Sequence, residues 1–188
     1  MSHGVGLGER FVGQPVSSLD DNDKLGGAPT GPLTLIAGAP GQNLNVFFYT
    51  TSNVLTGVGH LGFPDFNVIG KGAIALTFCS DQSEFGFQLV GGNGGNAFVD
   101  FSRSDGSLID SVTVSGLADT FYGFSRDGGV KDIRGISRWN DDAGGIGFDN
   151  LEHDVESDIP TVPEPSTHAM LIAGLAAVGV IARGRRSA

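Results

Sequence analysis

The chain has 188 residues, a formal net charge of -10 and 31 glycines that follow no three-residue period. The missing period excludes a collagen triple helix, and the acidic balance disfavours binding to nucleic acid or to anionic lipid. Glycine weakens helix interiors and favours turns, so the many glycines beside short Val, Ile and Phe runs predict an all-β protein.

Residues 1–32 carry little apolar pattern, and we expect a poorly ordered or truncated N-terminal segment there. From residue 33 onward, short apolar or alternating segments bounded by turn residues predict strands. The expected strands are 33–37, 44–51, 73–78, 85–89, 97–101, a returning strand with Val112 and Val114, 121–125, 133–139 and 146–155. Asp105-Gly106 predicts a type I′ hairpin turn before the returning strand.

Eight or nine short strands at this spacing predict an antiparallel β-sandwich over residues 33–156, followed by a linker at 157–161. Cys79 is the single cysteine, so no internal disulfide is possible. Its place in the apolar run 73–79 predicts a small buried side chain.

Strand alternation places the carboxylate of Asp149 on the same face as Leu151, which is expected to face the core. A carboxylate facing a core must accept hydrogen bonds or bind a cation. Asp149 therefore either caps neighbouring backbone groups or forms a calcium site together with Asp141 and Asp142. No other cofactor and no catalytic residue is expected, because no histidines have zinc-ligand spacing and no nucleophile motif is present.

Three aromatic residues leave a second question open. Trp139, Tyr122 and Tyr49 pack in the core or, if they are exposed on one face, stack on sugar rings.

The C-terminal end differs from the body. Residues 169–182 contain no polar or charged side chain, and Arg183, Arg185 and Arg186 follow at once. A helix of this length reaches about 21 Å, short of the ~30 Å hydrocarbon core, so it suits a temporary membrane stop with its arginines on the cytoplasmic side. The extended motif before it consists of Val162, Pro163, Glu164, Pro165, Ser166 and Thr167.

The ordered series of proline motif, apolar helix and basic end resembles the PEP-CTERM sorting signal of Gram-negative bacteria over residues 162–188. The resemblance implies recognition of Pro163, Glu164 and Pro165 by an exosortase, a membrane-embedded transpeptidase-like enzyme. The stretches 52–63, 82–87, 129–136 and 144–151 also resemble a group of PEP-CTERM proteins, which implies a jelly-roll-like sandwich without established activity. Because such proteins carry a signal peptide and residues 1–30 lack one, we expect a missing upstream segment.

These features predict an exported, non-enzymatic protein of the cell surface or extracellular matrix, including that of biofilms. Its partners would be an exosortase and, transiently through residues 169–182, the inner membrane, but not nucleic acid. The alternative is a lectin-like module that binds exopolysaccharide, with calcium as a structural ion. A hydrolase is the third possibility, although no pair of carboxylates is singled out by the sequence.

Overall fold

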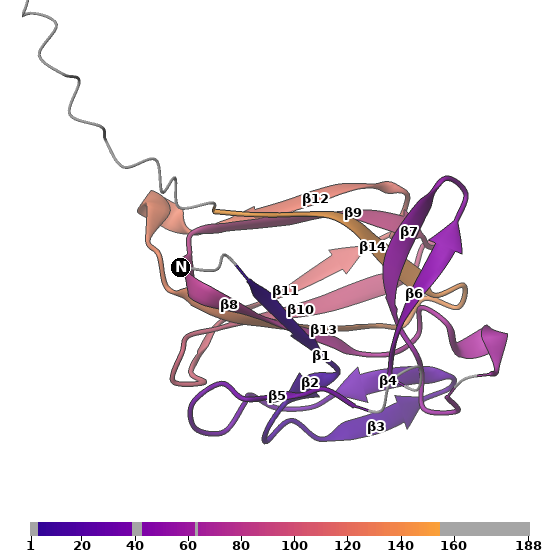
Figure 1. The fold of residues 1–188 in the computed structure, drawn as a ribbon, viewed down its shortest axis with the longest axis horizontal. Helices are drawn as coiled ribbons and strands as arrows, with labels where there is room; N and C mark the ends of the chain where they lie inside the picture. Colours follow the sequence, from indigo (N-terminus) through magenta and orange to yellow (C-terminus); the bar gives the residue numbers. More distant parts are fainter. Residues whose placement is uncertain (1–3, 39–42, 63, 155–188) are drawn as a thin grey trace, which may run out of the picture. The chain divides into compact units, whose positions relative to one another are not determined.

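Ten of the strands form two five-stranded antiparallel sheets. The computed structural model describes residues 4–38, 43–62 and 64–154. The order of the first sheet is β1 (Val5–Gly8), β8 (Ile74–Gln82), β13 (Ile133–Asn140), β10 (Asn96–Ser102) and β11 (Leu108–Ser115). The order of the second sheet is β12 (Thr120–Ser125), β9 (Glu84–Gly91), β14 (Ile146–His153), β7 (Ser52–Gly57) and β6 (Leu44–Tyr49). The two sheets face each other as a sandwich (Figure 1), which confirms the predicted fold class.

The core lies between the sheets because alternate residues of facing strands are apolar. The inward side chains of β8, β9 and β10 follow the predicted two-residue period. They are Ile74, Leu76, Phe78, Phe85, Phe87, Leu89, Ala97, Val99 and Phe101. Cys79 has the opposite parity to Phe78 and is exposed, so the predicted burial of the thiol is wrong.

Arg138 is a charged exception in this core. It has the same parity on β13 as Ile136, and its guanidinium lies 3.8 Å from the centre of the Phe148 ring. None of its three guanidinium nitrogens has a hydrogen-bond partner among the described residues. Burial lowers the pKa of Arg138 well below its ordinary value, because a charge is costly in an apolar interior.

Residues 4–32 differ from the expectation of a poorly ordered segment. β1 pairs with β8 in the sandwich, while β2 (Arg10–Phe11) pairs with β5 (Leu35–Ile36), and β3 (Val16–Leu19) pairs with β4 (Asn22–Leu25). Strands of two to four residues are too short for alternation to be recognised in the sequence. We call residues 10–36 the N-terminal layer, and Figure 1 shows β2 to β5 on the outer side of the first sheet.

Two local predictions also need correction. Gly106 has a φ of 86° and donates to the Arg103 carbonyl, but Asp105 is not among the residues with positive φ, so the turn is not type I′. A bulge at Asn150, whose φ is 46°, shifts the register of β14 after Asp149. Asp149 therefore lies on the outer face of the sheet, whereas Leu151 packs against the core.

The regular helices of the described residues are two short 3-10 turns, η1 (Phe66–Val68) and η2 (Asp127–Gly129). None of the helices described between residues 4 and 154 has the length and apolar character needed to cross a bilayer. The expected helix at 169–182 lies outside the described residues.

Candidate functional site

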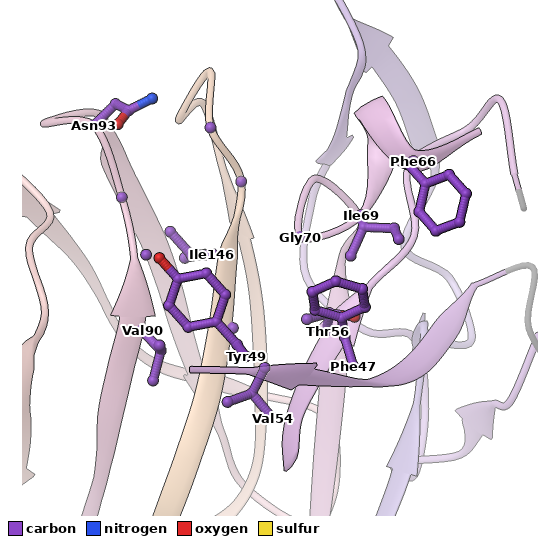
Figure 2. Close-up of a pocket in the computed structure, with 15 residues that line it drawn as sticks. Phe47, Tyr49, Val54, Thr56, Phe66, Ile69, Gly70, Val90, Asn93 and Ile146 are labelled. Atoms are coloured by element: carbon purple, nitrogen blue, oxygen red, sulfur yellow. The ribbon is translucent and has the colours of Figure 1, made fainter. Parts of the chain in front are cut away.

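An open groove of about 350 Å³ lies on the outer face of the second sheet (Figure 2). This volume falls at the lower end of the range of about 300–1,000 Å³ that is usual for small-molecule sites. The hairpin of β6 and β7 forms one wall, and the loops after β9 and before β14 form the other. The segment around η1 closes one end. We call this hollow the aromatic groove.

Strand register explains how the floor of the groove arises. Gly147 on β14 is paired with Thr56 on β7 and with Val90 on β9, and Phe47 on β6 is paired with Val54 on β7. Paired residues point to the same face, so these side chains lie on the side opposite Phe148 and the core. Gly147 leaves the floor open, because a Cβ there would stand 2.8 Å from Cγ2 of Val54.

Three aromatic rings face the aromatic groove. Phe47 and Tyr49 alternate with Phe48 on β6, so they point into the groove while Phe48 points away from it. Phe66 stands on η1, next to Ile69 (Figure 2). Tyr49 is 42% exposed and Phe66 is 69% exposed, so both rings present accessible surface.

A buried carboxylate, Asp142, fixes the opposite rim. One oxygen accepts hydrogen bonds from the backbone N–H groups of Asn93, at 2.7 Å, and Gly95, at 2.9 Å. The other oxygen accepts the N–H of Gly144 at 2.9 Å. Asp142 is 0% exposed, so these bonds join two glycine-rich loops through an acceptor shielded from water.

The end of the groove is held by close backbone approach. Gly70 has a φ of 83°, and a Cβ there would lie 2.6 Å from the backbone nitrogen of Ile146. The Gly70 carbonyl accepts hydrogen bonds from the Ile146 N–H and from the Asn140 side-chain amide, each at 3.0 Å. A side chain at position 70 would therefore separate the loops that form this end.

The fifteen residues that line the aromatic groove include no Asp, Glu, Lys, Arg or His. Polar character comes instead from the Tyr49 hydroxyl, the exposed Asn93 amide and the backbone of the glycine-rich loops. Such a lining can pack against an apolar surface and exchange hydrogen bonds.

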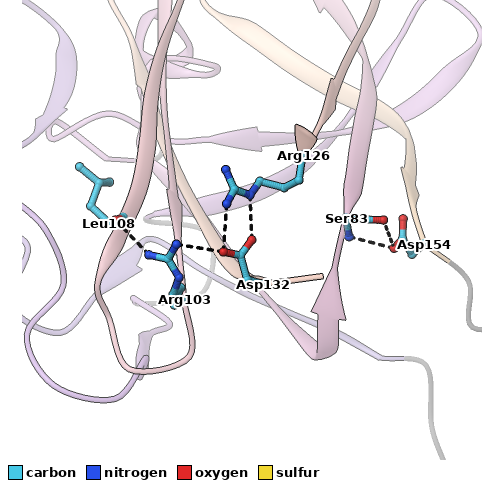
Figure 3. A network of polar contacts seen from close by, with 6 residues as sticks. All are labelled: Ser83, Arg103, Leu108, Arg126, Asp132 and Asp154. Atoms are coloured by element: carbon cyan, nitrogen blue, oxygen red, sulfur yellow. Dashed lines mark hydrogen bonds and ion pairs between the residues drawn. The ribbon is translucent and has the colours of Figure 1, made fainter. Parts of the chain in front are cut away.

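A polar network elsewhere serves the scaffold. Asp132 forms ion pairs with Arg126, at 2.8 Å, and Arg103, at 3.0 Å (Figure 3). Asp154 accepts hydrogen bonds from the backbone and hydroxyl of Ser83, at 2.8 and 2.6 Å. Burial of Asp154 favours its neutral form, but the Ser83 bonds and nearby Lys131 outweigh this and lower the pKa of Asp154.

The three calcium candidates are not brought together. Asp149 accepts the Ser52 hydroxyl at 2.6 Å and the Asn150 N–H at 2.8 Å, whereas Asp141 accepts the Asn96 N–H at 2.6 Å. Within the described ranges, no group of three or more acidic, His or Cys side chains is arranged to hold a metal ion. Asp149 thus caps neighbouring groups, which was the other possibility considered from the sequence, although its face was predicted wrongly.

The three aromatic residues singled out in the sequence have different surroundings. Trp139 stacks on Phe98 with ring centres 4.0 Å apart, and Tyr122 packs against Phe87. Tyr49 alone of the three lines the aromatic groove. Sequence reasoning missed Phe47 and Phe66. For Phe47 a signal existed, because alternation along a strand places Phe47 and Tyr49 on one face and Phe48 on the other, so the aromatic run at 47–49 cannot be buried as a whole.

The sorting residues predicted from the tail lie outside the described residues. These are Val162, Pro163, Glu164, Pro165, Ser166, Thr167, Arg183, Arg185 and Arg186. However, the family model of the PEP-CTERM protein-sorting motif matches residues 161–186, which confirms the resemblance. The chain therefore carries a PEP-CTERM sorting motif, which implies export and a C-terminal membrane-anchoring signal.

The comparison with curated proteins gives no significant match. One similar solved structure is the enzymatically active domain of tailspike protein 4 from bacteriophage CBA120, with 18% identity and a TM-score of 0.34 over 79% of this chain and 19% of that chain. Another is a CBM28 carbohydrate-binding module specific for non-crystalline cellulose, with 16% identity and a TM-score of 0.32 over 60% of this chain and 80% of that chain. The chain thus spans about a fifth of the tailspike structure, and neither TM-score indicates a shared fold.

Proposed function

We propose that this chain is a non-enzymatic protein of the cell surface or extracellular matrix, delivered through the inner membrane and processed by an exosortase. The match of the sorting motif to residues 161–186 is the observation that carries the proposal. The proline motif is the segment that the exosortase recognises. The apolar segment 169–182 holds the chain in the membrane temporarily, and the arginines that follow it keep its end on the cytoplasmic side.

The test is to follow the chain in a bacterial host that contains an exosortase, with an export signal supplied in front of it. Replacing Pro163, Glu164 and Pro165 together by alanine is expected to abolish removal of the tail and to leave the protein in the inner membrane. The matched control is Pro160→Ala, which changes a proline just outside the motif and is expected to be processed normally. Equal processing of both variants would refute the sorting role of the motif.

The uncharged lining of the aromatic groove supports the non-enzymatic part of this proposal. Hydrolysis of a glycosidic bond ordinarily uses two carboxylic groups, and the described residues that line the groove include none. Release of reducing ends from soluble polysaccharides by the purified protein would overturn this part alone.

A second candidate function is carbohydrate binding of the lectin type, directed at exopolysaccharide. The observation that favours it is the aromatic groove itself, because exposed rings beside uncharged polar groups suit a guest with both apolar and hydroxyl surfaces.

A further inference from the structure

We propose that the aromatic groove binds an uncharged glycan, with a sugar ring packed against Tyr49 and Phe47 on the β6–β7 hairpin. The inference rests on the second candidate function and adds to it a place, a ligand class and the residues that make contact. It does not depend on export or on the sorting tail.

The charge of the guest follows from the lining. None of the described residues that line the groove carries a charge, so an anionic sugar would lose its hydration without gaining an ion pair from them. The net charge of -10 on the whole chain also repels anionic polymers at longer range. A neutral glycan avoids both costs.

The aromatic wall suits the apolar face of a sugar ring. The C–H groups on one side of a pyranose form a flat patch, and they pack against an aromatic face much as another ring would. Tyr49 and Phe47 stand two residues apart on the same face of β6, and Figure 2 shows both rings beside the floor made by Val54 and Thr56. Two rings in series along one strand can hold consecutive units of a chain.

The opposite rim suits the hydroxyl groups of the same guest. The side-chain amide of exposed Asn93 offers both a donor and an acceptor on this rim, and the Tyr49 hydroxyl offers another on the facing wall. The N–H groups of Gly91, Gly144 and Gly145 already donate to Asp119 and Asp142, so these glycines leave only carbonyl oxygens for a ligand. Because Asp142 already holds Asn93 and Gly144 in place, a ligand would bind without ordering these loops. A purely apolar guest would leave this rim unused.

The inference can be tested by affinity electrophoresis and calorimetry on the full chain, purified in a mild detergent. The probes are three neutral glucans and mannans, namely laminarin, hydroxyethylcellulose and galactomannan, together with alginate as an anionic polymer. We expect at least one neutral polymer to retard the protein and alginate to have no effect. Binding of alginate alone would overturn the choice of an uncharged ligand.

The site is tested by two matched substitutions on one strand. Tyr49→Ala removes a ring that lines the groove and is expected to weaken the binding constant about tenfold or more. Phe48→Ala removes the neighbouring ring, which is 65% exposed but points away from the groove, and is expected to change binding less than about twofold. Both residues are exposed, so thermal unfolding should show that both variants stay folded.

The outcomes separate the site from the function. Loss of binding in Tyr49→Ala with retention in Phe48→Ala supports the assignment. If a neutral glycan binds and both variants bind it equally, the aromatic groove is not the site, although carbohydrate binding stands. If neither the neutral polymers nor alginate binds, both the assignment and the second candidate function fail, while the sorting proposal is untouched.

Discussion

The outer face of the first sheet is covered by the N-terminal layer, whereas the outer face of the second sheet carries the aromatic groove. On the first sheet, Gly135 and Ser137 of β13 lie under the N-terminal layer, where Phe11 fills the space above Gly135 and Gln14 donates to the Ser137 hydroxyl at 2.9 Å. On the second sheet, none of the segments that the structure describes covers Gly147, which lies in the floor of an open groove. The lack of a side chain on an outer-face glycine therefore serves two different purposes. At Gly135 it makes room for a covering segment, and at Gly147 it leaves space for a groove.

The largest effect is expected from the carboxylate that supports the open face. Asp142→Ala leaves three backbone N–H groups without their buried acceptor, so we expect a loss of about 4 kcal/mol in the free energy of unfolding. Chemical denaturation measures it, with Asp105→Ala as the control because Asp105 accepts one turn N–H at the exposed surface. Similar losses in the two variants would mean that the rim is not held by Asp142.

A slightly smaller loss is expected on the covered face. Phe11→Ala removes a ring that is fully buried between the N-terminal layer and Gly135, and the cavity should cost about 3 kcal/mol. The exposed ring of Phe48 again gives a control of the same chemistry, for which we expect less than about 0.5 kcal/mol. If Phe11→Ala unfolded no more readily than Phe48→Ala, the N-terminal layer would not be part of the folded unit.

Between the two faces, Arg138 offers a change of opposite sign. Arg138→Met replaces a buried charge that has no hydrogen-bond partner among the described residues by an apolar side chain of similar length, so we expect a gain of about 2 kcal/mol. Arg134→Met, on the same strand, removes the ion pair with Asp81 and should be nearly neutral because that pair is partly exposed. A marked loss of stability in Arg138→Met would show that the contact of the guanidinium with the Phe148 ring outweighs the cost of burying the charge.

The last effect depends on pH and again concerns the covered face. Asp23 is 2% exposed, and burial raises its pKa to about 6, helped by Glu9 and opposed by His60 and by backbone hydrogen bonds. The folded protein therefore keeps this proton more strongly than the unfolded chain, so its contribution is complete below about pH 4 and disappears as the pH rises through 6. We expect Asp23→Asn to be more stable than the parent at pH 7, by at most the ~3 kcal/mol to which a shift from 3.8 to about 6 corresponds, and close to it at pH 4. Thermal unfolding across this range would reveal the difference, and parallel pH profiles would contradict it.

The sequence was most informative where strands are long and half-buried. The alternation of Phe85, Phe87 and Leu89, or of Ala97, Val99 and Phe101, predicted both a strand and its inward face correctly, because each apolar residue there contributes to one common core. The N-terminal layer escaped prediction because its strands are very short and it is anchored by separate residues such as Phe11.

The candidate site was harder to predict because it depends on contacts between distant segments. Asp142 gains its role only when residues 93–95 lie beside it, and a single bulge at Asn150 was enough to reverse the predicted side of Asp149. Tyr49 was noticed as a possible sugar contact, but nothing local to it indicates that β6 forms one wall of a groove. The tail, by contrast, was recognised from sequence alone because its signal is a linear order of segments.

The attachment of the β6–β7 hairpin bears on which guests the groove would admit. β6 is the last strand of its sheet, and β7 is joined to β14 at only two residue pairs, with the Ser52–Asp149 hydrogen bond as a further tie near the tip. The floor and the opposite rim of the groove are held by several paired strands and by the hydrogen bonds of Asp142. The wall that carries Tyr49 has fewer such connections and is therefore the one that can move more easily. An outward movement of the β6–β7 hairpin would accommodate polymers with bulky branches. Selectivity would then depend on the linkage geometry of the glycan at the opposite rim more than on the width of the groove.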